Sequence, residues 1–147
     1  MKQLKNTNEP HLRLRHLIKE ISNRCGQQDD KLCGGIGLNV SESNVLSAFG
    51  REKEITSSEI ANKLELSNSR ITRIIDNLID KKLVKRNYST TDRRIINLTL
   101  SEKGFEKSKL LEHKYCKCYE DIINNSDEGE IKKIMDSLEK LIKLMSN

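Results

Sequence analysis

The feature that most constrains this fold is an apolar stripe between residues 67 and 82. Its members recur at positions i, i+3, i+4 and i+7, the spacing that places side chains on one face of an α-helix. They are Ile71, Ile74, Ile75 and Leu78. Ser67 stands directly before the stripe and is a residue type that commonly caps a helix N-terminus. We therefore predict a short helix that packs its isoleucine face inward.

A second short helix is predicted just before this one. Thr56 and Glu59 have the T-x-x-E spacing of a capping box, in which each side chain bonds the backbone N–H of the other residue. The apolar residues expected on its buried side are Ile60, Ala61 and Leu64. Residues 65–67 leave room for only a tight turn between the two helices. Two short helices joined in this way form a helix-turn-helix.

Two strands are predicted after this motif, at residues 83–88 and 94–100, because apolar side chains alternate along the second one. A hairpin that follows a helix-turn-helix directly is called a wing. Its approach and tip contain six cations against a single acidic residue, Asp92. The cations are Lys81, Lys82, Lys85, Arg86, Arg93 and Arg94. Such a patch is typical of a phosphate-binding surface, although a solvated charge run would have the same composition.

The N-terminal third predicts two further helices. Pro10 suits the first turn of a helix, and apolar residues at helical spacing place that helix at residues 10–25. The glycine-rich segment 26–38 is predicted to be a loop. Ser41 is then expected to cap a short helix, whose apolar residues are Val45, Leu46 and Phe49.

Two long helices are predicted at the C-terminal end. Ser101 would cap a helix that ends near Asn124, and Asp127 with Glu130 would cap the last helix. Both carry long apolar stripes, which indicate a subunit interface, although intramolecular packing would also account for them. The predicted fold is a single mostly α (α+β) domain over residues 1–147, with a winged helix-turn-helix core at 41–100 and dimerisation helices at 10–25 and 101–147.

The exposed face of the helix at 67–82 is polar and cationic in its first two turns and acidic later, at Asp76 and Asp80. Because acidic side chains repel phosphates, such a helix should enter a DNA major groove by its N-terminal end. The candidate DNA-binding residues on it are Ser67, Asn68, Ser69, Arg70, Thr72 and Arg73. The candidates from the hairpin are Arg86, Asp92, Arg93 and Arg94. The two tip arginines suit a narrow minor groove, and Asp92 would hold one of them in an extended pose.

Residues 66–104, LSNSRITRIIDNLIDKKLVKRNYSTTDRRIINLTLSEKG, resemble the helix-turn-helix and wing of the multiple-antibiotic-resistance regulator (MarR) family. That family's pattern has a small-residue cap, a T-R pair, a D-x-L run, K-x-L-V-x-R, a wing D-R-R and L-T/S-x-x-G. The matching residues here are Ser67, Thr72, Arg73, Asp76, Leu78, Lys82 to Arg86, Asp92, Arg93, Arg94, Leu100, Ser101 and Gly104.

The resemblance implies a winged-helix homodimer that binds pseudo-palindromic double-stranded DNA. It also implies a transcriptional regulator, which we expect to be a repressor, released from its operator by a small-molecule, metal or oxidant inducer. By the same resemblance Asp92 and Arg94 match the wing's D-x-R, and residues 67–73 match the DNA-reading segment.

The four cysteines are candidates for sensing: Cys25 and Cys33 in the first quarter of the chain, and Cys116 and Cys118 on the fifth helix. The zinc-uptake repressors of the family place metal ligands in matching regions, although their histidine-rich run is absent here apart from His113. A site for zinc, another thiophilic metal or metalloid, or an iron–sulfur unit is one reading. Redox sensing through a disulfide and purely structural cysteines are the others.

Several classes of protein are not expected. No apolar run approaches the roughly 20 residues that span a bilayer, and the N-terminus lacks a signal-peptide core. We therefore expect a cytoplasmic protein with no membrane partner. The sequence has no phosphate-binding glycine loop and no metalloprotease or nucleophile-elbow motif, so an enzyme is not expected. A winged helix used as a protein-interaction module is the alternative to a DNA-binding regulator.

Overall fold

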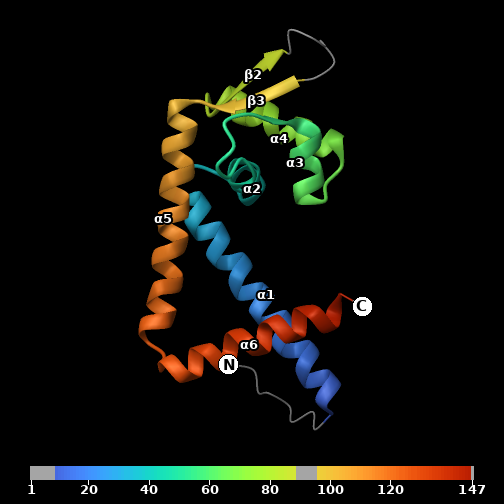
Figure 1. The fold of residues 1–147 in the computed structure, drawn as a ribbon, viewed down its shortest axis with the longest axis vertical. Helices are drawn as coiled ribbons and strands as arrows, with labels where there is room; N and C mark the ends of the chain where they lie inside the picture. Colours follow the sequence, from blue (N-terminus) through green and yellow to red (C-terminus); the bar gives the residue numbers. More distant parts are fainter. Residues whose placement is uncertain (1–8, 89–95, 147) are drawn as a thin grey trace. The chain divides into compact units, whose positions relative to one another are not determined.

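The computed structural model describes residues 9–88 and 96–146. Its elements are α1 Pro10–Gly34, α2 Val40–Ala48, β1 Ile55–Thr56, α3 Ser57–Leu64, α4 Asn68–Asp80, β2 Val84–Tyr88, β3 Ile96–Leu100, α5 Glu102–Asn124 and α6 Glu128–Met145 (Figure 1). The chain forms two compact units, residues 1–108 and residues 109–147, and α5 runs from the first into the second. The predicted winged helix-turn-helix is confirmed, whereas the assignment of one domain to the whole chain stays a prediction.

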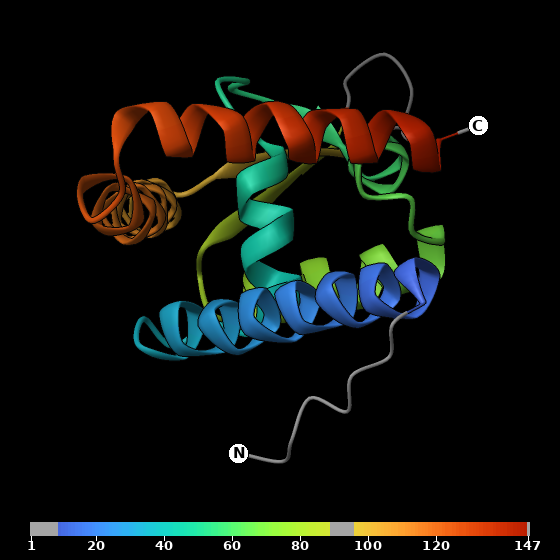
Figure 2. The same ribbon diagram turned by 90° about the horizontal axis from the view of Figure 1, so that it is seen from below.

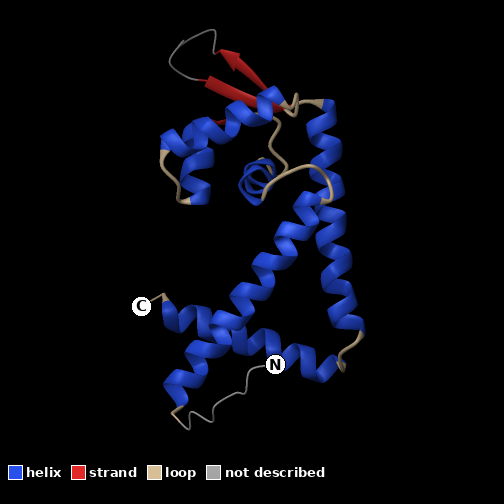
Figure 3. Cartoon of the chain, turned by 180° about the vertical axis from the view of Figure 1, so that it is seen from behind, coloured by secondary structure: helices blue, strands red, loops and turns tan. Residues whose placement is uncertain are grey.

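The wing is a three-stranded antiparallel sheet in which β3 lies between β1 and β2. The strands β2 and β3 form the predicted hairpin (red in Figure 3), with Arg86 opposite Leu98. The third strand, β1, was not predicted, because two residues are too few to show an alternating pattern. In it Ile55 pairs with Leu98 and Thr56 pairs with Asn97, so the sheet reaches the first residue of the helix-turn-helix.

The core of the first unit lies where α2, α3 and α4 contact one another behind the sheet. The predicted isoleucine stripe of α4 is buried, with at most 8% of any member exposed. The other fully buried side chains of this core include Val45, Leu46, Phe49, Ile55, Ile60 and Leu98. Full burial of one such side chain stabilises a fold by about 1.5–3 kcal/mol, so the stripe fixes which face of α4 is left for solvent.

The helix starts agree with their predicted caps in most places. Thr56 and Glu59 form the predicted capping box at the start of α3, and Ser67 Oγ accepts a hydrogen bond from the Arg70 amide at the start of α4. The cap of α2 was predicted wrongly, because Asn39 rather than Ser41 takes that position. Asn39 Oδ1 accepts from the Glu42 amide at 2.9 Å, and Glu42 Oε2 accepts from the Asn39 amide at 3.0 Å.

The first helix is longer than predicted. α1 continues without a break past residue 25 to Gly34 (blue in Figure 2), so the segment 26–34 is helix rather than loop. Cys33 therefore lies in the last turn of α1, where it is buried. The turn that follows is held by two lysine ammonium groups: Lys81 Nζ donates to the Gly37 carbonyl at 3.2 Å, and Lys107 Nζ donates to the Ile36 carbonyl.

The junction between the hairpin and α5 depends on Ser101, the predicted cap of that helix. The Ser101 amide donates to the Leu83 carbonyl at 2.9 Å, and Ser101 Oγ donates to the Lys82 carbonyl at 2.7 Å. Ser101 Oγ also accepts from the Gly104 amide at 2.9 Å. Lys82 has a φ of 60°, in the left-handed region, so the chain turns sharply as it leaves α4.

The second unit contains the remainder of α5 and all of α6. Asp127 caps α6 as predicted, with Asp127 Oδ2 accepting from the Gly129 amide at 3.1 Å. No residue of α6 is buried. The exposed large apolar side chains of α6 are Ile134, Met135, Leu138, Ile142, Leu144 and Met145.

Candidate nucleic-acid interface

The second helix of the helix-turn-helix, α4, has two chemically different sides. The isoleucine stripe fixes one side in the core, so the opposite side is left in solvent. All six predicted DNA-binding residues of this region are exposed: Ser67, Asn68, Ser69, Arg70, Thr72 and Arg73. The predicted surface is therefore formed by one continuous segment at the N-terminal end of α4.

The short side chains of this segment are anchored to the helix itself. Thr72 Oγ1 donates to the Asn68 carbonyl at 2.9 Å, and Ser67 Oγ lies 3.2 Å from Ser69 Oγ. The two arginines are different, since the side chains of Arg70 and Arg73 make no ion pair or hydrogen bond to another residue of the described ranges. Their guanidinium groups are thus available to an anionic or hydrogen-bonding partner.

The first helix of the motif, α3, has a capping box at its start and a left-handed residue at its end. Thr56 N and Oγ1 each donate to Glu59 Oε2 at 2.7 Å, and these hydrogen bonds, that of the backbone amide first, hold the pKa of Glu59 below its ordinary value of 4.5. At the other end Glu65 adopts φ 53°, which ends α3 and turns the chain toward α4. The capping box and a tight turn at residues 65–67 were both predicted, whereas the left-handed conformation of Glu65 was not.

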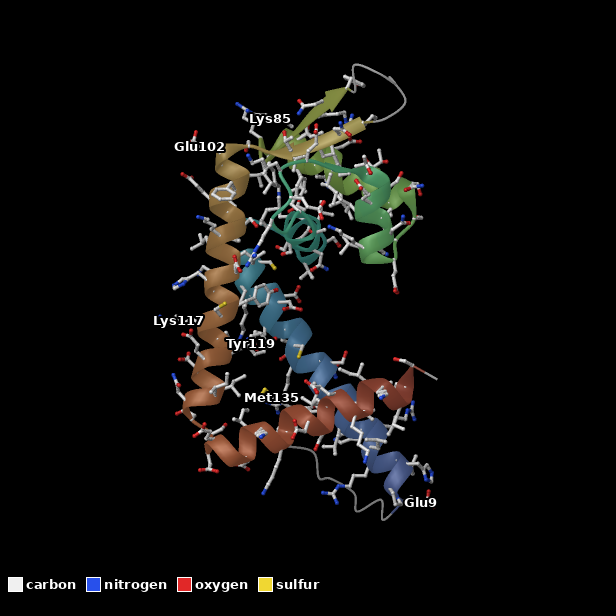
Figure 4. The ribbon with its side chains drawn as sticks, viewed as in Figure 1. Glu9, Lys85, Glu102, Lys117, Tyr119 and Met135 are labelled. Carbon is white, nitrogen blue, oxygen red and sulfur yellow. The ribbon has the colours of Figure 1, made fainter. Side chains whose placement is uncertain are left out.

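The hairpin contributes one exposed cation in the described ranges of its strands. Lys85 projects from β2 into solvent (Figure 4), and the next exposed position, Asn87, lies near Thr99 on β3 with Nδ2 and Oγ1 3.4 Å apart. Three predicted DNA-binding residues, Asp92, Arg93 and Arg94, lie outside the residues that the structure describes. Their role stays a prediction.

Arg86 was predicted to bind DNA, but it lies in an ion pair within the motif. Arg86 Nη2 lies 2.8 Å from Asp76 Oδ1 on α4. This pairing was not predicted, and Asp76 was expected only to repel phosphates. A signal was present, because Arg86 is two residues after buried Val84 and strand side chains at i and i+2 share a face.

The cysteines are distributed over two helices. Cys25 and Cys116 are exposed, Cys118 is half-buried and Cys33 is buried. Because α1 is continuous, the eight residues from Cys25 to Cys33 separate their Cα atoms by about 12 Å along the helix axis. Zinc–thiolate bonds are about 2.3 Å, so these two thiolates cannot share one ion while α1 is intact.

The remaining metal candidate set is also not assembled within the described ranges. No three His, Cys, Asp or Glu side chains gather there to hold an ion. His113 and Cys116 both lie exposed on α5. The predicted set of Cys25, Cys33, Cys116, Cys118 and His113 therefore contains at least two incompatible members, and the bound metal stays a prediction.

The fold and the exposed arginines of α4 together define a winged helix-turn-helix protein with a candidate DNA-reading helix. Residues 36–95 match the model of the MarR family. This match includes α2, the helix-turn-helix and the strand β2, and it makes residues 36–95 a MarR-family segment.

Named relatives agree with this assignment. The HTH-type transcriptional repressor MdtR of Bacillus subtilis (strain 168) is 34% identical over 68 residues, which are 46% of this chain and 44% of the relative. The B. subtilis HTH-type transcriptional regulator YpoP is 33% identical over 100 residues, covering 68% of this chain and 65% of YpoP. The aligned segments thus span less than two thirds of either relative. These names are those of transcription regulators, in agreement with the prediction that the chain is not an enzyme.

A solved structure matches over a greater length. Streptococcus pneumoniae FabT, in a crystal structure with DNA, superimposes with a TM-score of 0.81 and covers 92% of this chain and 97% of FabT. The sequence identity is 23%, so this likeness shows the fold.

In the described ranges, no helix is both long and apolar enough to cross a membrane.

Proposed function

We propose that this chain is a transcriptional regulator that binds a pseudo-palindromic DNA operator sequence-specifically as a homodimer and acts as a repressor. The observation that carries the proposal is the exposed N-terminal half of α4. There the side chains of Arg70 and Arg73 are exposed and have no partner in the described ranges, while Ile71 and Ile75 on the opposite side are buried in the core. The names of MdtR and YpoP, and the DNA bound to FabT, support the same reading.

The chemistry of this segment suits a major groove. A guanidinium can donate two parallel hydrogen bonds to guanine O6 and N7, and this is the commonest specific base contact. The N-terminus of a helix also carries a partial positive charge that favours phosphates. We therefore assign base contacts to Arg70 and Arg73, and phosphate or base contacts to Asn68 and Ser69.

We propose that the apolar face of α6 binds a second copy of the chain. Every residue of that helix is at least partly exposed, and its large apolar side chains recur at helical spacing. Leu138 is 41% exposed and Met135 (labelled in Figure 4) is 48% exposed. An apolar helix face of this length in water marks an interaction surface, and a second copy also supplies the second recognition helix that a pseudo-palindrome requires.

Dimerisation is tested by sedimentation velocity over a range of protein concentrations. Leu138→Lys should shift the protein toward monomer and weaken operator binding, because it places a charge on the apolar face. Glu139→Lys, at the next exposed position, is the matched control and should remain dimeric. A parent protein that sediments as a monomer at micromolar concentration would contradict the dimer.

DNA binding is tested by fluorescence anisotropy on duplexes selected from a random library. Because phosphate binding releases counterions, the logarithm of the association constant should fall linearly with the logarithm of salt concentration. Arg73→Ala should weaken binding to the selected duplex by about 1–3 kcal/mol and relax the preference at one position of the site. Lys132→Ala, an exposed cation on α6, is the control.

The outcomes separate the two function classes. If no selected duplex binds better than random DNA, and binding is weak at every salt concentration, the chain is not a sequence-specific DNA-binding protein. The winged-helix protein-interaction module would then become the better proposal. The same selected duplex, placed upstream of a reporter gene, tells repression from activation.

We further propose that a thiophilic metal, a metalloid or an oxidant is the inducer and acts through the cysteines. The exposed thiols of Cys25 and Cys116 support this choice, since exposed thiols are the ones that ions and oxidants reach. Reduced protein is titrated with zinc ion, arsenite and peroxide while operator binding is followed, beside Cys25→Ser and Cys116→Ser. An operator affinity that none of these agents changes would remove the cysteines from regulation and leave the DNA-binding proposal intact.

A further inference from the structure

Arg86 leaves its strand on the side that faces the core. Side chains alternate between the two faces of a strand, so Arg86 shares a face with buried Val84, whereas Lys85 lies on the opposite, exposed face. The cross-strand partner of Arg86 is Leu98, which is completely buried. The Arg86 side chain therefore begins at the inner face of the hairpin.

The guanidinium of Arg86 is already engaged with α4. Nη2 donates to Asp76 Oδ1 at 2.8 Å. The Nε atom is buried and has no hydrogen-bond acceptor in the described part of the chain. Only 30% of the Arg86 side chain is exposed, against 54% of the Asp76 side chain. Nε is therefore not accessible to a phosphate, and Nη2 is already bonded to Asp76.

The position of Asp76 explains why such a partner is needed. Asp76 follows Thr72 by four residues and Arg73 by three, so it lies on the same side of α4, one turn farther from the helix N-terminus. An unpaired carboxylate there would repel the phosphates that the arginines attract. A cation reaching α4 from the wing removes that repulsion without occupying the DNA-reading surface.

We propose that Arg86 is a positioning residue that fixes the wing strand β2 to the recognition helix α4 and neutralises Asp76, and that it is not a phosphate ligand. This inference rests on the proposed DNA-binding function. It replaces the prediction that Arg86 contacts DNA, and it gives Asp76 a role in binding that its charge alone would not suggest.

A double-mutant cycle tests the proposal on operator binding. Arg86→Gln alone should weaken binding by roughly fivefold, the scale of one partly exposed ion pair. In the Asp76→Asn background the same Arg86→Gln change should have no further effect, because no carboxylate is left to hold or neutralise. A phosphate ligand behaves differently: Arg86→Gln would weaken binding in both backgrounds and make the salt dependence shallower by about 0.9.

Matched controls come from the neighbouring residues. Lys85→Gln removes an adjacent cation from the opposite face of β2, and its effect should simply add to that of Asp76→Asn. Asp80→Asn removes the other exposed carboxylate of α4, and it should not change the effect of Arg86→Gln. Coupling between Arg86 and Asp80 as large as that between Arg86 and Asp76 would overturn the pairing.

A measurement without DNA separates this proposal from the proposed function. Amide hydrogen exchange in β2 should become faster in Arg86→Gln and in Asp76→Asn, and the double variant should exchange no faster than either single variant. If the parent binds no DNA, the proposed function fails, and the exchange rates alone decide whether the pair holds β2 on α4. Unchanged exchange in Arg86→Gln would overturn the positioning role.

Discussion

Gly104 lies directly against the backbone carbonyl of Leu83, so closely that a Cβ atom on Gly104 would come within 2.0 Å of the Leu83 oxygen. The same carbonyl accepts the hydrogen bond of the Ser101 amide. The first turn of α5 thus packs by its backbone against Leu83, the residue just before β2. Only glycine at position 104 allows this approach, because any other residue would place a Cβ atom against the carbonyl.

Replacing Gly104 with Ala should therefore destabilise the first unit. The new methyl group meets backbone rather than a flexible side chain, so the contact is relieved only by moving α5 or the start of β2, and overpacking of this kind costs about 1–3 kcal/mol or more. Chemical denaturation followed by circular dichroism measures the loss. An unchanged midpoint would mean that α5 shifts freely at this junction.

Gly26→Ala should have the opposite effect. Gly26 lies inside α1, and a Cβ atom there would have nothing within 4 Å. Exchange of glycine for alanine inside an exposed helix stabilises it by roughly 0.5–1 kcal/mol. The same denaturation experiment measures the gain. If α1 ended near residue 25, as its sequence first indicates, the substitution would bring no gain.

Lys81→Ala should destabilise the contact between α2 and α4. Lys81 Nζ lies 2.7 Å from Glu42 Oε2, and Glu42 is only 2% exposed, so removal of the ammonium leaves a buried carboxylate without its cation. Loss of a hydrogen bond to a charged group costs about 1.5–3 kcal/mol. Arg24→Ala, which breaks the exposed pair with Glu20, should cost no more than about 0.5 kcal/mol in the same assay.

The capping box of α3 predicts a pH dependence. The folded-state pKa of Glu59 is lowered, first by the Thr56 backbone hydrogen bond, so its carboxylate stabilises the fold fully above the ordinary value of 4.5. That contribution is lost as the pH falls through the lowered pKa. Glu59→Gln should therefore be less stable than the parent at pH 7, and the difference should shrink toward pH 3. A gap of equal size at both pH values would exclude the carboxylate as its cause.

The continuous first helix makes a prediction about oxidation. The Cα atoms of two disulfide-bonded cysteines lie within about 7 Å, whereas Cys25 and Cys33 are about 12 Å apart along α1. Oxidation of the native protein followed by peptide mapping should give no Cys25–Cys33 disulfide. The same oxidation in enough urea to unfold the protein should allow it, because α1 is then no longer a helix. A native Cys25–Cys33 link would show that the end of α1 unwinds.

Local patterns accounted for the parts of the fold that local physics decides. The T-x-x-E box fixed the start of α3, and the i, i+3, i+4, i+7 stripe fixed the buried face of α4, because caps and helix periodicity depend on residues within one or two turns. The DNA-binding candidates, five on α4 and its N-cap Ser67, could be predicted as exposed for the same reason, because they lie away from the buried isoleucine face.

The errors arose where distant residues decide the outcome. Glycines at the end of α1 suggested a loop, yet the helix continues, and Lys81 and Lys107 hold the turn after it from far along the chain. The pairing of Arg86 with Asp76 depends on how the hairpin lies on α4, which neither segment encodes alone. The two-residue strand β1 is defined by its pairing with β3, which lies about 40 residues farther along the chain.

Thr56 takes part in two elements at once, as the β1 partner of Asn97 and as the cap of α3. Because the residue at position 56 must suit both a strand and a helix cap, few amino acids are compatible with it. Valine would suit the strand and lose the cap, whereas aspartate or asparagine would cap the helix and disfavour the strand. Threonine meets both demands and serine comes nearest to it, so this position should drift little among relatives that keep the three-stranded wing.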